Sequence, residues 1–380
     1  MALRNSLGQS RKEPPPGADS KRIAIFRFGY IGDTIVALPA LRVVRSLYPE
    51  AKIYYMTKET SRAKIEPGTE VLHQGTLYDD VIYYRGGRNF FTSSIERVRS
   101  LRDLKAKRID TLIYLPSFRT PAQIKRDKIF FRAAGIKNII GLKGYKTADY
   151  HPKGKPLPMV PKESQVLLRH LQLDGVASED PSLIRFDLDL SDREREEAVA
   201  WLNGQTGLMA DAEVVIGIAP GSKMSSKRWP ISRFEEVVRC LDQRYRANFV
   251  VFGSAREAAL CKQIASVPRH GVNAAGDLSV RGSAAVFEHV DMYIGNDTGT
   301  MHIAASAGVP CVAIFSARDW PGRWYPHGTG HRILRSIVDC EGCMLEECNN
   351  QNLCLTQIST EAVLAEAEEV LSSLIQKVPK

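Results

Sequence analysis

Short apolar runs alternate along this chain with stretches in which apolar residues recur at helical spacing. The run RIAIFRF at 22–28 ends at Gly29 and predicts a buried parallel strand. The next stretch predicts an amphipathic helix from about Thr34 to Leu47, which Pro49 stops. Further strands are predicted at 52–57, 80–84 and 110–115, and further helices at about 93–107 and 162–173. This alternation is typical of a doubly wound α/β domain.

The same pattern restarts at Val214. Strands are predicted at 214–219, 248–253, 291–295 and 311–315, with helices between them at 231–245, 256–266 and 299–307. A terminal helix from about Thr360 to Lys377 has one apolar face, formed by Val363, Leu364, Ala367, Val370, Leu371 and Leu374. We therefore predict an α/β protein built from two doubly wound units, with the boundary between them near 180–195.

The turn after the first strand argues against a dinucleotide site. Gly29-Tyr30-Ile31-Gly32-Asp33 lacks the G-x-G-x-x-G spacing that brings a pyrophosphate close to the backbone. Two facing domains, with a ligand cleft between the carboxyl ends of both sheets, are therefore favoured over one long dehydrogenase-like chain.

The charge of the chain is unevenly distributed. The net charge is +9, but residues 1–180 carry 32 Lys and Arg against 18 Asp and Glu, whereas residues 181–380 carry 20 against 25. A basic N-terminal half suggests an anionic partner, which could be a nucleic acid, a phospholipid surface or an acidic glycolipid. The alternative is a solvated basic surface that aids solubility.

Two sequence features bear on the location of the protein. The chain has no apolar run of the ~20 residues that cross a bilayer. Its first residues also lack the apolar core of a signal peptide. We expect residues 1–20 to form a disordered tail and the protein to be cytoplasmic.

The segment Gly295-Asn296-Asp297-Thr298-Gly299-Thr300-Met301-His302 lies between a predicted strand and a predicted helix. Gly299 allows the backbone to approach a ligand, and the amides of residues 298–300 open a helix N-terminus that suits a diphosphate. Asp297 could accept sugar hydroxyls. The alternative is an Asp/Thr cap on a purely structural helix.

A second segment, 219–230, follows another predicted strand and reads APGSKMSSKRWP. Its Ser- and Gly-rich loop carries three cations, so that backbone amides and Lys227 could bind phosphates. It is not a P-loop, because G-x-x-x-x-G-K-[ST] is absent. The alternative is an exposed basic loop without a ligand.

Together these segments resemble glycosyltransferase family 9, which includes the ADP-heptose:lipopolysaccharide heptosyltransferases. The motifs occur in the family's order: I-x-R-F-x-x-I-G-D-x-x-x-x-L-P-A-L at 25–41, P-G-S…K-R-W-P at 220–230 and G-N-D-T-G-x-M-H-x-A-A-x-x-G-x-P at 295–310. The resemblance runs from Arg22 to about Ile358.

The resemblance implies a GT-B fold of two facing Rossmann-like domains. Residues 21–185 would bind the acceptor and residues 186–358 the nucleotide-sugar. The C-terminal helix at 359–380 would pack back on the N-terminal domain.

The resemblance also assigns roles to individual positions. Asp33 matches the general base, Lys227 the lysine at the donor phosphate and sugar, and Asp297 the heptose-binding carboxylate. The other donor-binding positions are Ser222 in the lysine loop, Glu257 at the ribose, Leu278 near the adenine, Thr298, Gly299 and Thr300 at the diphosphate turn, and His302 in the first turn of the helix.

Physical chemistry fits these roles. Inverting sugar transfer needs a base near the acceptor hydroxyl and stabilisation of the departing diphosphate. A carboxylate at position 33 is favoured by the helix dipole, and Lys227 with the amides near Gly299 would meet the leaving group's charge, so that catalysis requires no metal. Asp187-Leu188-Asp189 matches the D-x-D of metal-dependent transferases only superficially and is interpreted as part of a linker.

Four cysteines cluster late in the chain, at 340, 343, 348 and 354. The Cys340–Cys343 spacing suits a structural zinc or iron site, whereas the spacing to Cys348 and Cys354 is tighter than usual. A structural metal, reduced thiols and a redox disulfide all stay open at this point.

The sequence thus predicts an inverting, metal-independent glycosyltransferase that moves heptose from ADP-heptose to an anionic lipid-linked core oligosaccharide, with peripheral association at the cytoplasmic face of the inner membrane. Candidate acceptor contacts are Arg85, Arg88, Arg119, Lys125 and Arg126. The alternatives are a family member with another nucleotide-sugar or a protein acceptor, and a nucleotide-sugar epimerase of the same fold. A module that binds nucleic acid is disfavoured, because it would not explain the 295–302 turn or the Lys227 loop.

Overall fold

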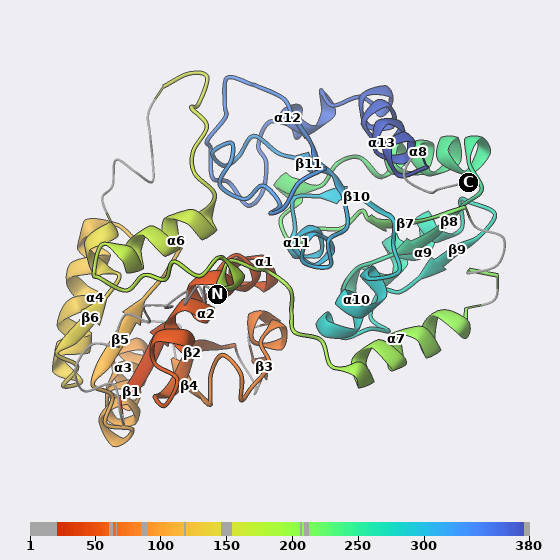
Figure 1. The fold of residues 1–380 in the computed structure, drawn as a ribbon. Coiled ribbons are helices and arrows are strands. Elements are labelled where there is room, and N and C mark those ends of the chain that lie inside the picture. Colours follow the sequence, from red (N-terminus) through yellow and green to blue (C-terminus); the bar gives the residue numbers. More distant parts are fainter. Residues whose placement is uncertain are drawn as a thin grey trace, which may run out of the picture.

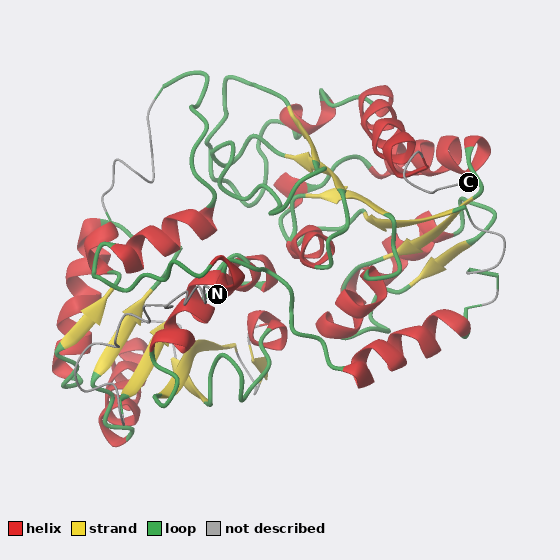
Figure 2. Ribbon diagram, viewed as in Figure 1, coloured by secondary structure: helices red, strands yellow, loops and turns green. Residues whose placement is uncertain are grey.

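A computed structural model of the protein describes residues 21–60, 64–65, 67–84, 90–117, 119–145, 154–205, 207–208 and 213–375. The tail expected at 1–20 lies outside these residues. Two sheets form the centres of two domains that lie side by side (Figure 1). Helices cover both faces of each sheet (Figure 2), so the predicted α/β class with two doubly wound units is confirmed.

The N-terminal sheet has the strand order β3-β2-β1-β5-β6, and β4 also pairs with β2. Its strands are β1 (Arg22–Phe26), β2 (Lys52–Thr60), β3 (Lys64–Ile65), β4 (Asp80–Tyr84), β5 (Thr111–Tyr114) and β6 (Asn138–Ile140). All pairs are parallel except β2 with β3. The central strand β1 is buried on both faces, which explains its continuous apolar run.

Two pairs of helices bury the faces of this sheet. Ala24 and Phe26 pack under α3 (Phe90–Ala106) and α4 (Pro121–Ala133). Ile23 and Ile25 belong to a second cluster with α2 (Leu38–Leu47) and α6 (Glu163–Gln172). That second cluster continues into the C-terminal domain, so the two domains share apolar packing.

The C-terminal sheet is entirely parallel, in the order β12-β11-β10-β7-β8-β9. Its strands are β7 (Val214–Ala219), β8 (Ala247–Val251), β9 (Gly271–Asn273), β10 (Met292–Asn296), β11 (Cys311–Phe315) and β12 (Arg332–Arg335). The helices are α7 (Asp192–Asn203), α8 (Ile231–Arg244), α9 (Ala258–Ala265), α10 (Val280–Phe287), α11 (Gly299–Ser306), α12 (Leu353–Thr356) and α13 (Thr360–Ile375).

The predicted helix from Thr34 to Leu47 is two helices, α1 (Ile31–Ile35) and α2 (Leu38–Leu47). The break falls just before Pro39, which lies in the first turn of α2. Proline has no amide hydrogen to donate and its ring clashes with the carbonyl four residues earlier, so it starts a helix and cannot continue one. Asp33 therefore lies in a separate short helix at the carboxyl end of β1.

The terminal helix α13 corrects one expectation. It packs against α8 and the C-terminal sheet, not on the N-terminal domain. Its apolar face, with Val363, Ala367 and Leu371 fully buried, completes the cover on the side of that sheet where α8 and α9 lie. The physical reason is that this amphipathic face is buried most fully on the nearest uncovered strands, β10 to β12.

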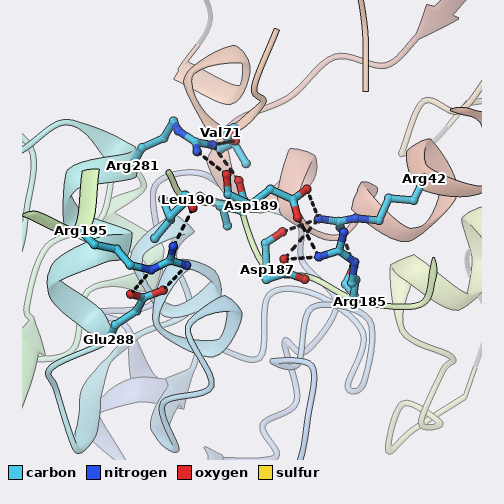
Figure 3. A network of polar contacts seen from close by, with 10 residues as sticks. Arg42, Val71, Arg185, Asp187, Asp189, Leu190, Arg195, Arg281 and Glu288 are labelled. Atoms are coloured by element: carbon cyan, nitrogen blue, oxygen red, sulfur yellow. Dashed lines mark hydrogen bonds and ion pairs between the residues drawn. The ribbon is translucent and has the colours of Figure 1, made fainter. Parts of the chain in front are cut away.

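Arginines from both domains form hydrogen bonds and ion pairs with the segment that joins the domains (Figure 3). Arg42 of α2 donates to the carbonyls of Arg185 (2.8 Å) and Asp187 (2.7 Å) and pairs with Asp189 (2.8 Å). Arg281 of α10 donates to the carbonyls of Leu188, Asp189 and, in the N-terminal domain, Val71. Asp187-Leu188-Asp189 thus lies in the linker between the domains.

In the described part of the chain, every helix is too short or too polar to span a lipid bilayer.

Candidate functional site

Asp33 lies at the carboxyl edge of the N-terminal sheet, in the first turn of α1. Its Oδ2 accepts a hydrogen bond from the Tyr30 amide (2.9 Å) and its Oδ1 accepts one from the Ser117 hydroxyl (3.0 Å). The carboxylate is about one quarter exposed (24%). Two donors therefore hold a partly solvated carboxylate in one orientation, which is what a general base requires.

Lys227 and Asp297 form an ion pair at the carboxyl edge of the C-terminal sheet. Their Nζ and Oδ2 atoms are 2.6 Å apart, and the side chains are 15% and 5% exposed. Lys227 ends a short 3-10 turn after β7, and Asp297 directly follows β10. The two sequence motifs thus meet in one site, as parallel neighbouring strands require.

Asn296 connects the lysine loop and the turn after β10 by hydrogen bonds. It is fully buried, its Oδ1 accepts a hydrogen bond from the Trp229 amide (3.1 Å), and its Nδ2 donates to the carbonyl of Pro220 (2.8 Å). The sequence analysis assigned it no role, although its place directly before Asp297 in the motif was a signal. Asn296 fixes the distance between the lysine loop and the 297–302 turn.

The remaining predicted donor positions lie in loops and at helix starts of the C-terminal domain. Thr298 is the N-cap residue of α11, and Gly299 and Thr300 begin the helix. Ser222 is buried, and its Oγ accepts a hydrogen bond from the amide of Met224 (3.3 Å). Glu257 lies against Gly221, because a Cβ at that glycine would come within 2.1 Å of its Oε1. Leu278 is half-buried just before α10.

The two domains touch where the helices α1 and α11 begin. A Cβ on Gly32 would lie 2.7 Å from Cδ2 of His302, and a Cβ on Gly299 would lie 2.9 Å from Cβ of Ile31. The ammonium group of Lys223 also lies 3.9 Å from the ring centre of Tyr30. Both glycines are therefore needed for this close approach of the two domains, at which the charges of Asp33 and Lys227 both act on His302.

His302 is buried at this junction. Burial and the positive charge of Lys227 together lower the pKa of its imidazole to about 4, although Asp33 opposes the shift. Its Nδ1 has no hydrogen-bond partner among the described residues. The ring is therefore neutral in the folded protein at physiological pH.

This shift predicts acid instability. The unfolded imidazole binds a proton below about pH 6.5, whereas the folded one does so only below about pH 4. Stability should therefore be fully present above pH 6.5 and fall as the pH drops toward 4, by about 3 kcal/mol for this one ring. His302→Asn should reduce this pH dependence in thermal melts, whereas His73→Asn, at an exposed ring, should keep it. An unchanged slope in His302→Asn would contradict the assignment.

The candidate acceptor residues are only partly brought together. Arg119 and Arg126 both pair with Asp127, at 3.1 and 2.9 Å. Arg119 lies two residues after Ser117, and its guanidinium group lies beside Asp127 and over the Phe26 ring. Lys125 is exposed on α4. Arg85 and Arg88 lie outside the described residues.

The cysteine-rich segment packs on the lysine loop. Cys348 accepts hydrogen bonds from the amides of Asn350 and Asn352 (both 3.3 Å), and Asn352 in turn donates to the carbonyl of Ser225 (3.1 Å). Ser226 bonds to the carbonyl oxygens of Leu345 (2.7 Å) and Glu346 (3.2 Å). Within the residues described, no three His, Cys, Asp or Glu side chains are arranged to hold a metal ion. The segment that carries the four cysteines thus supports the Lys227 loop through Asn352, Leu345 and Glu346.

The geometry as a whole suits group transfer. One domain presents an oriented carboxylate, and the other presents a buried lysine–carboxylate pair beside the N-terminus of a helix. A helix N-terminus and an ammonium group together stabilise an anionic phosphate group that departs.

Comparisons with known proteins agree with this arrangement. The sequence profile of glycosyltransferase family 9 (heptosyltransferase) matches residues 97–354. The lipooligosaccharide heptosyltransferase 2 of Campylobacter jejuni is 23% identical over 173 residues, which cover 44% of this chain and 54% of that protein. The chain thus matches about half the length of this relative.

Two solved structures share the fold. The glycosyl transferase family 9 protein from Veillonella parvula has a TM-score of 0.71 and 22% identity, with 93% of this chain and 98% of that chain covered. The Escherichia coli heptosyltransferase WaaC, solved with ADP-2-deoxy-2-fluoro heptose, has a TM-score of 0.59 and 16% identity, with 92% and 99% covered. The expected GT-B architecture is therefore confirmed. Because the matched profile spans about two thirds of the chain, the protein belongs to glycosyltransferase family 9, the heptosyltransferases.

Proposed function

We propose that the protein transfers heptose from ADP-heptose to an anionic lipopolysaccharide core acceptor, with inversion at the anomeric carbon and without a catalytic metal. The observation that carries the proposal is that the buried Lys227–Asp297 pair and Asp33 both lie near the junction of the two domains, where the charges of Lys227 and Asp33 both act on His302. The family membership and the ADP-heptose analogue in the WaaC structure support the choice of donor.

In the proposed reaction Asp33 removes the proton of an acceptor hydroxyl, whose oxygen then forms a bond to the anomeric carbon of the heptose. The bond from that carbon to the β-phosphate oxygen breaks, and its electron pair leaves with ADP. Lys227 and the amides that begin α11 stabilise the charge on the diphosphate. Asp297 orients the sugar hydroxyls, and Glu257, which lies next to Gly221, binds the ribose in this proposal.

A screen of donors tests the proposal. ADP-heptose should raise the melting temperature, because it binds only the folded protein, whereas UDP- and GDP-sugars should not. Transfer to a core oligosaccharide should follow with the same donor. Stabilisation by another nucleotide-sugar would overturn the choice of donor. Conversion of the nucleotide-sugar into its epimer without any acceptor would indicate an epimerase.

The outer faces of α3 and α4 support an anionic partner. Their exposed basic side chains include Arg97, Arg102, Lys105, Lys125, Lys128 and Arg132. Asp103 is the exposed acidic residue among the described side chains of these two helices. Val98 (48% exposed) and Ile129 (61%) add apolar contacts on the same helices. We propose that this surface holds the protein at the cytoplasmic face of the inner membrane, where a lipid-linked acceptor is presented.

Transfer to a lipid-linked acceptor in anionic vesicles should therefore weaken as salt rises, because exposed charges are screened beyond ~8–10 Å at physiological ionic strength. Neutralising Arg119 and Arg126 should raise the acceptor KM about three- to tenfold and spare the donor KM. Lys262→Ala, at an exposed site in the other domain, is the control. If transfer did not depend on salt, and the protein sedimented equally with neutral and with anionic vesicles, the anionic acceptor and the membrane-binding surface would both be refuted.

A structural zinc or iron at Cys340, Cys343, Cys348 and Cys354 stays a prediction. If a metal is held there, the purified protein should contain it at near-stoichiometric amounts, and a chelator should lower both the melting temperature and the donor affinity, since this segment supports the Lys227 loop. Elemental analysis and donor titration check this. A metal-free preparation whose melting temperature and donor affinity a chelator does not change would mean that the four thiols bind no metal.

A further inference from the structure

A buried ion pair lies directly beneath the Asp33 turn. Arg27, at the end of β1, is fully buried and donates to the carbonyl of Asp33 through Nε (3.0 Å) and Nη2 (2.7 Å). Its Nη2 is also 3.9 Å from Asp33 Oδ1. Arg27 therefore holds the backbone of the base and places a positive charge beside its carboxylate.

Glu163 balances this charge from the other side. It begins α6, is fully buried, and its Oε1 is 3.4 Å from Nη1 of Arg27. Its Oε2 is buried and has no hydrogen-bond partner among the described residues. A buried pair of this kind rarely adds stability over an apolar replacement, and an unsatisfied oxygen makes it more costly. The pair therefore calls for a role other than stability.

The position of Glu163 connects both domains to the base. Its amide donates to the carbonyl of Arg323 in the C-terminal domain (2.9 Å), and the amide of Val160 donates to that of Pro321 (2.9 Å). Glu163 thus lies where α6, the β1–α1 turn and the C-terminal domain meet.

We propose that Glu163 is a positioning residue for Asp33, which holds Arg27 in place and sets how strongly the guanidinium acts on the base. The kinetic part of this inference rests on the transfer reaction proposed above. The electrostatic part does not, because it concerns only groups that are already in contact.

The carboxyl of Glu163 changes its charge near neutral pH. Burial raises the pKa of its carboxyl to about 7, the charges of Arg27 and Arg323 oppose the rise, and Asp33 adds to it. The groups that act on Arg27 are Glu163, Asp33, Tyr55 and Tyr145. Asp33 also faces His302, near which Lys227, Lys162 and His331 lie.

The direction of the effect follows from these charges. Below neutral pH Glu163 is uncharged, and the full charge of Arg27 stabilises the Asp33 carboxylate, which makes it a weaker base. As the pH rises through about 7, Glu163 ionises and offsets that charge, so Asp33 becomes a stronger base. Turnover should therefore rise with pH near neutrality.

Glu163→Gln tests the kinetic part, because it keeps the shape of the side chain and fixes it uncharged. At pH 8 its kcat should fall about three- to tenfold, at pH 6 it should be near the parent value, and both KM values should stay within about twofold. Asp242→Asn is the control, since Asp242 of α8 is also a buried carboxylate and pairs with Arg269 (3.2 Å) away from the base. It should keep the parent pH profile. If Glu163→Gln does not fold, Glu163→Asp takes its place, and its kcat should rise less than the parent's between pH 6 and pH 8.

Carboxyl NMR with glutamate labelled at the δ-carbon tests the electrostatic part without any substrate. The Glu163 signal is assigned by its absence in Glu163→Gln or Glu163→Asp. Its titration midpoint should fall in Asp33→Asn, because a negative neighbour has been removed, and should not move in Asp297→Asn.

Two outcomes would overturn the inference. One is an equal loss of kcat at pH 6 and pH 8 in Glu163→Gln, which indicates a merely structural role. The other is an unchanged Glu163 midpoint in Asp33→Asn, which shows that the two carboxyls are not coupled. Absence of transfer with every donor would instead refute the proposed function, and the NMR result would still decide the coupling.

Discussion

Asp33→Asn should lose most of the transfer activity and keep its affinity for the donor. The amide oxygen can still accept from the Tyr30 amide and the amide nitrogen can donate to the Ser117 hydroxyl oxygen, so the turn should stay in place, but the amide cannot remove a proton. Base catalysis contributes ~100- to 10,000-fold, so kcat should fall by that factor. Turnover assays and donor titration by calorimetry check both halves of this expectation.

The control for this variant lies at the opposite edge of the same sheet. Asp110 accepts a hydrogen bond from the Arg22 amide (2.8 Å) at the amino ends of β1 and β5, far along the strands from the base. Asp110→Asn should therefore transfer at the parent rate. Full activity in Asp33→Asn would mean that another group removes the proton.

Lys227→Ala should weaken donor binding about ten- to a hundredfold. It removes the charge-assisted contact that we propose Lys227 makes to the donor, and it also leaves the Asp297 carboxylate, 5% exposed, without its partner. An unpaired carboxylate at this place repels a diphosphate, so the loss should exceed that of one hydrogen bond. Donor titration measures the change, and thermal melts show whether the fold is kept.

A double variant separates these two contributions. In Lys227→Ala with Asp297→Asn the repulsive charge is gone, so part of the lost donor affinity should return, although Asp297→Asn alone weakens donor binding. Lys262→Ala, on an exposed helix of the same domain, should bind the donor as the parent does. Strictly additive losses would show that the pair does not act as a unit at the donor site.

Much of the fold could be predicted because its signals are local. The strands at 214–219 and 311–315 have the predicted bounds, since each is a short apolar run buried on both faces. The strand at 80–84 also has the predicted bounds, although Tyr83 on it is exposed. α4 and α10 were not predicted. In α4, only Asp127 and Phe131 are buried, and cations occupy most of the outer face, so its apolar spacing is weak.

The sequence alone determined the two α/β domains, the family resemblance and the positions of Asp33, Lys227 and Asp297, because strands, glycine turns and motif spacing are properties of neighbouring residues. Tertiary structure decided what depends on packing between distant segments. It placed α13 on its own domain, linked Asn296 to the lysine loop, and brought Ser117, Arg27 and Glu163 to the base. Glu163 lies 136 residues from Arg27. No local pattern marks that pair, since a buried charge is recognised only through the side chains and backbone that surround it.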